Sequence, residues 1–220
     1  MAGKVRVGVL ASGRGSNLQA IIDAAAAGKL PNVEFAVVLS DNADAYALER
    51  ARKHGIPAEF VDPKAHRRRE DYDAALLARL RGHNVGLVLL AGYMRLVGMS
   101  LVEAYPNRMI NIHPALLPSF PGLHVQKKAI EYGVRFSGCT VHFVDGGMDT
   151  GPIIIQAVVP VLQDDDEDAL AARILRQEHK IYPEAVRLFS EGRLEVQGRR
   201  VLIKDGAKGP DDFLTNPPIK

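Results

Sequence analysis

An asparagine and a histidine two residues apart are the first groups in this sequence whose types and spacing suggest chemistry. Asn111 and His113 lie in the apolar run 109–113, which predicts a short buried strand. Side chains two apart on a strand leave the same face, so an amide and an imidazole are aimed at one point. Three prolines within 114–121 then end the strand. Polar groups at the carboxyl end of an apolar strand are where α/β enzymes bind ligands.

Taken alone, His113 is more often a buried core histidine than a catalytic one, so further partners along the chain are needed to favour a site. Candidates follow the strand predicted over 137–144, which also carries His142. There the loop 145–152 holds Asp145 and Asp149 among glycines. Such aspartates indicate either turn chemistry or a functional loop.

A second candidate site is the glycine-rich run 13–17, between a predicted strand and a predicted helix. Such a loop gathers unpaired backbone N–H groups at the positive end of the helix dipole, which suits a phosphate. Ser16 and Asn17 add side-chain donors, and Asn17 is also a reasonable N-cap. Leu18 replaces the third glycine of the dinucleotide fingerprint and no Lys-Ser/Thr follows, which favours a phosphate monoester. The alternative is a tight turn without a ligand.

The elements that must position these residues alternate along the first half of the chain. We expect strands over 5–11, 33–40, 58–61, 85–91, 109–113, 137–144 and 153–161, helices over 18–25, 45–54, 71–81, 99–104, 125–132 and from about 169 with Pro183 as a kink, and a hairpin over 193–203. The fold class is therefore α/β: an open, mostly parallel twisted sheet with helices on both faces, Rossmann-like in the N-terminal half and with antiparallel strands in the C-terminal half.

Composition restricts the class of protein. A chain of 220 residues can bury one sizeable core, so we expect one domain over 1–220, with a loose tail over 204–220. The net charge of +2 gives no argument for nucleic acid or membrane as a partner. Cys139 is the single cysteine and is expected to be buried. Without a signal peptide or a membrane-length apolar run, we expect a cytoplasmic protein, and we leave open a homodimer.

Three stretches together resemble the phosphoribosylglycinamide formyltransferase family, the folate-dependent enzymes of purine synthesis. They are Gly-Arg-Gly-Ser-Asn-Leu-Gln-Ala-Ile over 13–21, Asn-Ile-His-Pro-Ala-Leu-Leu-Pro over 111–118, and the segment 141–152. The last two occur across enzymes that use formyltetrahydrofolate, whereas the first points to the glycinamide ribonucleotide enzymes. The resemblance extends from about residue 5 to residue 183. It implies a phosphate-substrate-binding half over about 1–105 and a folate-binding and catalytic half over about 106–203.

The resemblance implies transfer of a formyl group from N10-formyltetrahydrofolate, a co-substrate, to the primary amine of glycinamide ribonucleotide, without a metal. It implies the catalytic residues Asn111, His113 and Asp149. It implies that the substrate is bound by Gly15, Ser16, Asn17, Gln177 and Glu178. It implies a folate pocket lined by Arg69, Met94, Arg95, Leu96, Val97, Asn111 and the backbone from Val144 to Asp149. The chain departs from commoner versions in having Gly146-Gly147 in that loop, which should loosen it.

The chemistry of such a transfer agrees with the residue types. Attack of an amine on a formyl carbon creates an oxyanion that needs donors placed in advance. Protonated His113 and the amide of Asn111 are suitable donors, and a carboxylate such as Asp149 would raise the pKa of His113. No serine or cysteine motif offers a covalent nucleophile.

Four alternatives stay open at this point. Two are other formyl-folate enzymes: methionyl-tRNA formyltransferase, which normally has a further RNA-binding domain, and formyltetrahydrofolate hydrolase, which would need no phosphate loop. A third is a dinucleotide-dependent oxidoreductase, against which the missing third glycine argues. The fourth is a metal-dependent hydrolase using His113, His142 and Asp149, which lacks histidines at helix-face ligand spacing.

Overall fold

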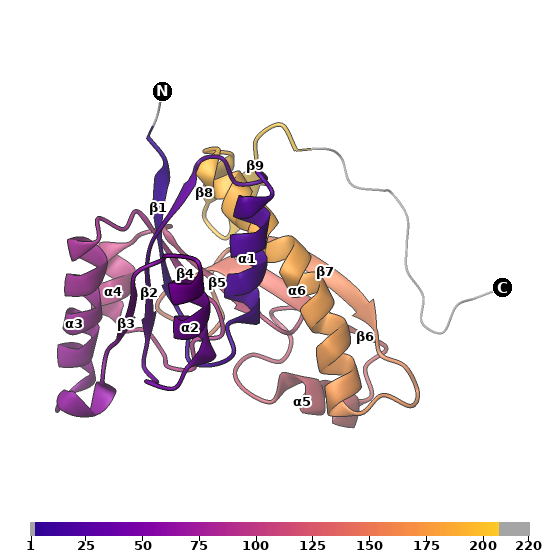
Figure 1. Cartoon of the computed structure of the whole chain (residues 1–220). Helices are drawn as coiled ribbons and strands as arrows, with labels where there is room; N and C mark the ends of the chain where they lie inside the picture. The colour runs from indigo at the N-terminus through magenta and orange to yellow at the C-terminus, as the bar shows by residue number, and fades with distance from the viewer. Residues whose placement is uncertain (1–2, 207–220) are drawn as a thin grey trace.

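The computed structural model describes residues 3–206, and its strands form one nine-stranded sheet within that range (Figure 1). The strand order is β3-β2-β1-β4-β5-β6-β7-β9-β8. The strands are β1 (Val5–Leu10), β2 (Val33–Ser40), β3 (Ala58–Phe60), β4 (Leu87–Leu90), β5 (Met109–His113), β6 (Phe136–Phe143), β7 (Ile153–Pro160), β8 (Leu194–Gln197) and β9 (Arg200–Ile203).

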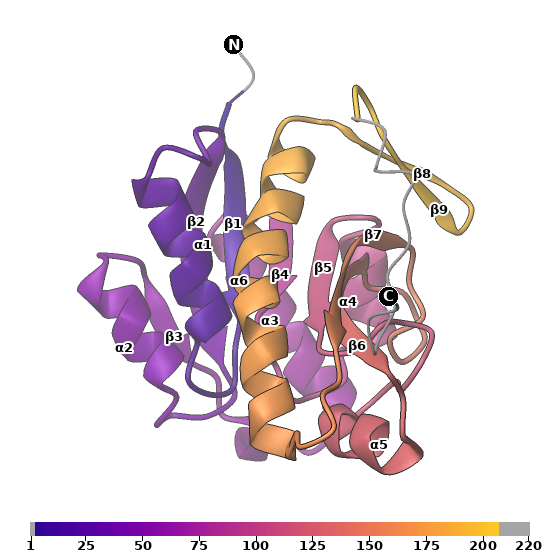
Figure 2. The same cartoon turned by 90° about the vertical axis from the view of Figure 1, so that its right-hand side faces the viewer.

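Helices cover both faces of this sheet, as the alternating pattern predicts. They are α1 (Ser16–Ala26), α2 (Tyr46–Lys53), α3 (Arg69–Gly82), α4 (Met99–Ala104), α5 (Val125–Tyr132) and α6 (Glu167–Ser190), with the short 3₁₀ helix η1 (Pro63–Ala65). Ile21 of α1 and Tyr182 of α6 pack into the core on one face, while Leu76 of α3 and Leu101 of α4 pack into the core on the other. Figure 2 shows α6 running beside α1 along the length of the sheet.

The sheet changes direction at β5. Strands β3, β2, β1, β4 and β5 pair in parallel, whereas β6 is antiparallel to both β5 and β7. The hairpin of β8 and β9 is also antiparallel, and it joins the sheet through a parallel pairing of β9 with β7. The predicted fold class, parallel first and antiparallel later, is confirmed.

Several element boundaries differ from the expectation by one or two residues, such as α3, which begins at Arg69, and β4, which spans Leu87–Leu90. Helix α1 begins at Ser16, two residues earlier than predicted, because Gly15 provides its N-cap. Helix α6 continues as one helix from Glu167 to Ser190 with Pro183 inside it. Of the tail expected to be loose, residues 204–206 form a turn in which Lys204 N–H donates to Arg193 O (2.9 Å), and residues 207–220 lie outside the described residues.

Two smaller expectations concern the burial of Cys139 and membrane-spanning helices. Cys139 is fully buried in β6, as predicted, and burial raises the pKa of its thiol to about 12. Between residues 3 and 206, the structure contains no helix with the length and apolar character needed to cross a bilayer.

Candidate active site

Strands β5 and β6 bring two pairs of polar side chains together. In their antiparallel register, Asn111 lies opposite His142 and His113 lies opposite Thr140. Residues that alternate along both strands share one face, so the four side chains form one cluster. His113 is 4% exposed and His142 is 2% exposed, Thr140 is fully buried, and Asn111 is partly buried.

His113 is held between a backbone carbonyl and a carboxylate. Its Nε2 lies 2.9 Å from the carbonyl oxygen of Phe120, which can only accept, so Nε2 carries a proton. Its Nδ1 lies 3.4 Å from Oδ2 of Asp149. A favourable contact there also needs a proton on Nδ1, so the imidazolium form satisfies both partners. His113 is therefore buried and hydrogen-bonded, as a core histidine would be, and it also faces the predicted carboxylate.

The amide of Asn111 contacts two acceptors. Its Nδ2 lies 3.2 Å from Nε2 of His142 and 3.5 Å from Oδ1 of Asp149. His142 donates its Nδ1–H to the carbonyl oxygen of Phe143 (2.8 Å), which leaves its Nε2 unprotonated in the neutral ring. Burial lowers the pKa of His142, which favours that neutral form.

Asp149 reaches the cluster from the loop between β6 and β7. The residue has φ of 55°, and its Oδ2 accepts the N–H of Gly122 at 2.9 Å. The structure therefore brings Asn111, His113 and Asp149 together. The spacing predicted that the first two share a face, and the resemblance implied the third.

The loop that carries Asp149 is tied internally by Asp145. Oδ1 of Asp145 accepts the N–H of Gly147 (3.0 Å) and the hydroxyl of Thr150 (2.6 Å). A Cβ on Gly147 would lie 2.0 Å from Oγ1 of Thr150, so no larger residue fits this conformation. This glycine has a packing role that the sequence did not indicate.

Thr140 is a positioning residue that the sequence analysis missed. Its Oγ1 donates to the carbonyl of Ala115 (2.7 Å) and accepts the N–H of Leu117 (3.1 Å) and Nε2 of Gln156 (3.0 Å). These bonds hold the proline-rich segment after His113 against β6. The sequence contains a pattern that could have indicated it, because Thr140 and His142 are two residues apart on β6, as Asn111 and His113 are on β5.

The predicted phosphate loop is closely packed by α2. Gly15 has φ of 68°, and a Cβ there would lie 2.8 Å from Cα of Ala47. Ala47 N–H donates to the carbonyl of Gly13 (3.0 Å), and Nε of Arg50 donates to the carbonyl of Arg14 (2.8 Å). The first turn of α1 therefore starts from a fixed loop, and its backbone N–H groups have no partner within the helix.

The side chain of Asn17 corrects one prediction. Asn17 is 8% exposed and turns inward, so that its Nδ2 donates to Oε2 of Glu178 at 2.7 Å. The expected N-cap role is wrong, because Gly15 occupies that position without a side-chain cap. Burial raises the pKa of Glu178, and the bond from Asn17 partly opposes that shift. Within residues 3–206, Oδ1 of Asn17 has no hydrogen-bond partner.

The resemblance implies that both Gln177 and Glu178 bind the substrate, and the structure places the two side chains in different surroundings. Glu178 is buried against Asn17, whereas Gln177 lies on a more exposed side of α6, where its Oε1 accepts from Nζ of Lys180 at 3.4 Å. The structure joins Glu178 to the phosphate loop and does not join Gln177 to it.

The residues expected to line the folate pocket lie on and around the loop after β4. Met94 N–H donates to Oγ of Ser12 (2.9 Å), and the guanidinium of Arg95 lies 5.4 Å from the ring centre of Tyr72. Arg69 lies 3.7 Å from the carboxylate of Asp73 on α3. Arg69, the first residue of α3, and Arg95 therefore both contact side chains of that helix.

This loop lies beside the Asp149 loop. Val97 and Val144 pack against the same hydrophobic core, the one that contains Leu76 and Leu101. A Cβ on Gly146 would lie 2.8 Å from Sδ of Met99. Met94 and Leu96 are 66% and 56% exposed. Apolar side chains that stay exposed next to a polar cluster are typical of a ligand-binding rim.

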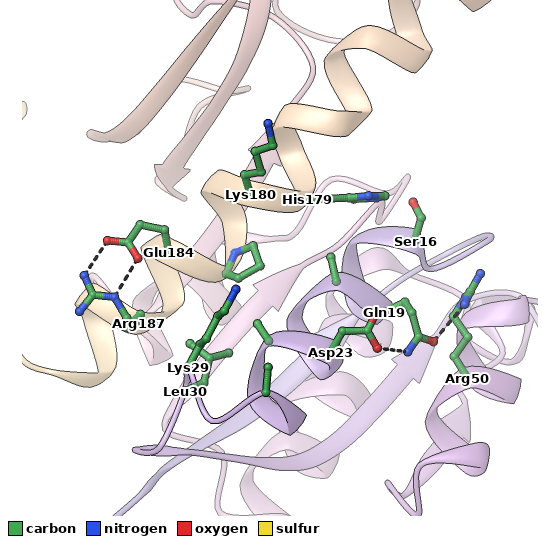
Figure 3. A pocket seen from close by; sticks show the side chains of 14 residues that line it. Ser16, Gln19, Asp23, Lys29, Leu30, Arg50, His179, Lys180, Glu184 and Arg187 are labelled. Carbon is green, nitrogen blue, oxygen red and sulfur yellow. Dashed lines mark hydrogen bonds and ion pairs between the residues drawn. The ribbon is translucent and has the colours of Figure 1, made fainter.

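A cavity of about 750 Å³ lies elsewhere, between α1 and α6 (Figure 3). Ser16 is the one predicted site residue among its described lining residues, and Figure 3 shows His179 extending toward it. Arg187 and Glu184 pair on its wall. The cavity adjoins the phosphate loop but does not contain the Asn111 cluster.

The metal alternative has no support from geometry in the described part of the chain. No group of three or more His, Cys, Asp or Glu side chains within residues 3–206 is arranged to hold a metal ion. Nε2 of His142 is instead occupied by the amide of Asn111.

The fold and site define an α/β enzyme in which buried donors and a carboxylate meet at the carboxyl end of a strand, beside a helix N-terminus suited to phosphate. The family model for formyl transferases matches residues 5–186, and this chain belongs to that family. Membership implies a formyl-folate co-substrate.

Individual relatives agree with the family. The chain is 44% identical over 202 residues to phosphoribosylglycinamide formyltransferase of Escherichia coli K12, covering 92% of this chain and 94% of the relative. The trifunctional purine biosynthetic protein adenosine-3 of Drosophila melanogaster is 48% identical to this chain over 188 residues, which are 85% of this chain. This chain spans only 14% of that protein's length. It is similar to the crystal structure of glycinamide ribonucleotide transformylase 1 from Symbiobacterium toebii, with a TM-score of 0.91, 56% identity and coverage of 93% of this chain and 96% of that one.

Proposed function

We propose that this protein transfers the formyl group of N10-formyltetrahydrofolate to the primary amine of glycinamide ribonucleotide in purine biosynthesis. The observation that carries the proposal is the convergence of Asn111 and Asp149 on the buried His113. The helix N-terminus at Ser16 adds a place for a phosphate, and the named single-function relative is a phosphoribosylglycinamide formyltransferase.

The contacts to Asp149 support direct transfer through a tetrahedral intermediate. The distances from its carboxylate to His113 (3.4 Å) and Asn111 (3.5 Å) exceed the 2.7–2.9 Å or so of a strong charged hydrogen bond. Both N–H groups can therefore turn toward an oxyanion that forms beside them. Asp149 keeps the positive charge of His113 balanced while this happens.

The bond changes balance without a covalent enzyme intermediate. The amine nitrogen bonds to the formyl carbon, and the bond from that carbon to N10 of the folate then breaks. The amine loses a proton, with a bound water or His113 as its acceptor, and N10 of the departing tetrahydrofolate gains one. The protein orients two small molecules and stabilises charge, so this mechanism uses no metal.

The phosphate end and the glycinamide end of the substrate suit neighbouring groups at the start of α1 and on α6. The backbone N–H groups of Gly15, Ser16 and Asn17 suit the phosphate. The carboxylate of Glu178 suits a donor group from the glycinamide or ribose end, because it is buried and directed to this region by Asn17. Arg69, Arg95 and the exposed side chains of the loop after β4 suit the folate.

The test is an acceptor comparison with one formyl donor. Purified protein is supplied with N10-formyltetrahydrofolate and, in separate reactions, with glycinamide ribonucleotide, water alone or initiator methionyl-tRNA. We expect formyl transfer to glycinamide ribonucleotide only. Release of formate at a comparable rate without an amine acceptor, or formylation of the tRNA, would instead favour the hydrolase or the tRNA enzyme.

A further inference from the structure

His142 is buried beside the reacting groups, yet the transfer mechanism gives it no role. It lies opposite Asn111 in the register of β5 and β6, and its Nε2 is 3.2 Å from Nδ2 of Asn111. Its other nitrogen is fixed, because Nδ1–H donates to the carbonyl of Phe143, the next residue along β6, at 2.8 Å. The backbone therefore determines which nitrogen of His142 carries the proton.

This proton position determines how the Asn111 amide is oriented. Nδ2 of Asn111 faces two acceptors at once, the bare Nε2 of His142 and Oδ1 of Asp149. If the amide turned over, its carbonyl oxygen would face the Asp149 carboxylate and a ring nitrogen without a proton, and both contacts would be repulsive. If Nε2 of His142 gained a proton, it would present an N–H to the amide N–H₂ and would favour the turned amide.

We propose that neutral His142 is a positioning residue that keeps the N–H₂ of Asn111 directed toward the reaction, and that protonation of its Nε2 switches formyl transfer off in acid. This inference rests on the proposed function, because it assigns His142 a part in that reaction. It makes one cross-strand pair responsible both for the donor geometry and for part of the pH dependence.

The surroundings of His142 set the pH range of this effect. Asp149 (3.8 Å from Nε2) and Asp145 face it from the loop after β6 and favour protonation, whereas His113 on β5 opposes it. The residue of β7 that pairs with His142 is Ile153, which carries no charge. Burial outweighs these charges and lowers the pKa of His142, so the loss of activity falls on the acidic side of the ordinary histidine value of about 6.5.

The first test compares His142→Gln with His142→Ala. A glutamine can offer an oxygen to Asn111 but does not titrate, whereas an alanine offers nothing. We expect His142→Ala to reduce kcat at least about tenfold at pH 8 with KM for the folate nearly unchanged, because the donor is misdirected rather than the cofactor lost. We expect His142→Gln to keep most of kcat at pH 8 and to lose less activity than the parent protein as the pH falls.

The matched control is His83→Gln, since His83 pairs with Glu59 (2.6 Å) away from this cluster. It should keep the parent pH profile. An unchanged kcat in His142→Ala, or an acid limb in His142→Gln identical to that of the parent, would overturn the proposal.

The second test reads the protonation of the parent protein directly. The ¹⁵N shifts of the histidine rings in the labelled parent protein report which ring nitrogen carries a proton, and His142→Gln assigns the signal. We expect the neutral Nδ1–H form for His142 at pH 7, and an Nε2–H form would overturn the proposal. A parent protein that shows this form but transfers no formyl group to glycinamide ribonucleotide would instead contradict the proposed function.

Discussion

The cluster on β5 and β6 and the loop after β4 serve the same reaction in the proposed function, but they are built in opposite ways. In the cluster, His113, His142 and Thr140 are buried and each has assigned hydrogen-bond partners. In the loop, Met94 and Leu96 leave more than half of their side-chain surface exposed. The cluster is formed by adjacent strands, whereas the loop is a connection that leaves the carboxyl end of β4.

This difference indicates where precision is needed. Groups that stabilise a developing charge must be in place before the reaction, so they lie on strands whose partners fix every proton. Groups that accept a flat cofactor can adapt, so methionine and leucine on a loop suffice. Substitutions in the cluster should therefore act on kcat and on stability, while substitutions in the loop should act on KM for the folate.

The largest effect is expected from the cluster itself. His113→Ala and Asp149→Asn should each lower kcat about 10²- to 10³-fold, because the first removes a donor to the oxyanion and the second removes the carboxylate that supports this donor. Asparagine tolerates the positive φ of position 149, so the loop should keep its shape. Steady-state kinetics and a folate-analogue titration measure both quantities. Weak analogue binding with normal turnover in either variant would remove the contrast between cluster and loop.

Next in size is the effect of Thr140, the member of the cluster that holds the chain after His113. Thr140→Val should lower the free energy of unfolding by about 2 kcal/mol, because the carbonyl of Ala115 and the N–H of Leu117 lose a buried partner. Urea unfolding measures the change. Thr140→Ser, which keeps the hydroxyl, is the matched control and should recover most of the loss.

The phosphate loop should respond through the substrate. Gly15→Ala places a Cβ 2.8 Å from Cα of Ala47 at a positive φ, so the start of α1 must shift. We expect a loss of roughly 1–2 kcal/mol in stability and a higher KM for glycinamide ribonucleotide, with KM for the folate unchanged. Equal changes in both KM values would mean that the loop does not bind the phosphorylated substrate selectively.

Glu178 should show a conflict between stability and function. Its pKa is raised in the folded protein, so its contribution to stability is full below the unfolded value of about 4.5 and is lost as the pH rises through the folded value. Glu178→Gln keeps an acceptor for Asn17 but removes the buried charge. We therefore expect the variant to gain thermal stability relative to the parent at pH 8, to gain less at pH 5, and to lose activity. Thermal unfolding at the two pH values tests the sign.

The smallest effects are expected in the loop. Met94→Ala and Leu96→Ala should change the free energy of unfolding by no more than about 0.5 kcal/mol, because both side chains are largely exposed. They should raise KM for the folate a few-fold and leave kcat unchanged. A fall in kcat without a change in KM would show that this loop is as closely tied to the chemistry as the cluster.

The sequence predicted those parts of the site that follow from strand periodicity. Asn111 and His113 were placed on one face by their spacing, and the structure agrees. Thr140 and His142 follow the same rule on β6, but the pairing of β5 with β6, which makes them neighbours of that face, is a long-range contact that no local pattern contains.

Side-chain direction at a helix start was not predictable in the same way. Asn17 is a residue type that often caps helices, yet Gly15 occupies the N-cap position with a left-handed backbone. The side chain of Asn17 instead points toward Glu178, 161 positions away in the chain. The parallel pairing of β9 with β7 likewise depends on tertiary contacts beyond the hairpin pattern that predicted β8 and β9.

The central claim is that Asn111 and His113 bind the tetrahedral state more strongly than the formyl-bearing ground state. The most direct measurement compares the dissociation constant of a folate analogue bearing a tetrahedral gem-diol carbon at the formyl position with that of a planar analogue, in the parent protein, Asn111→Ala and His113→Ala. The account predicts that both variants lose at least tenfold more affinity for the tetrahedral analogue than for the planar one. Equal losses for the two analogues would contradict it.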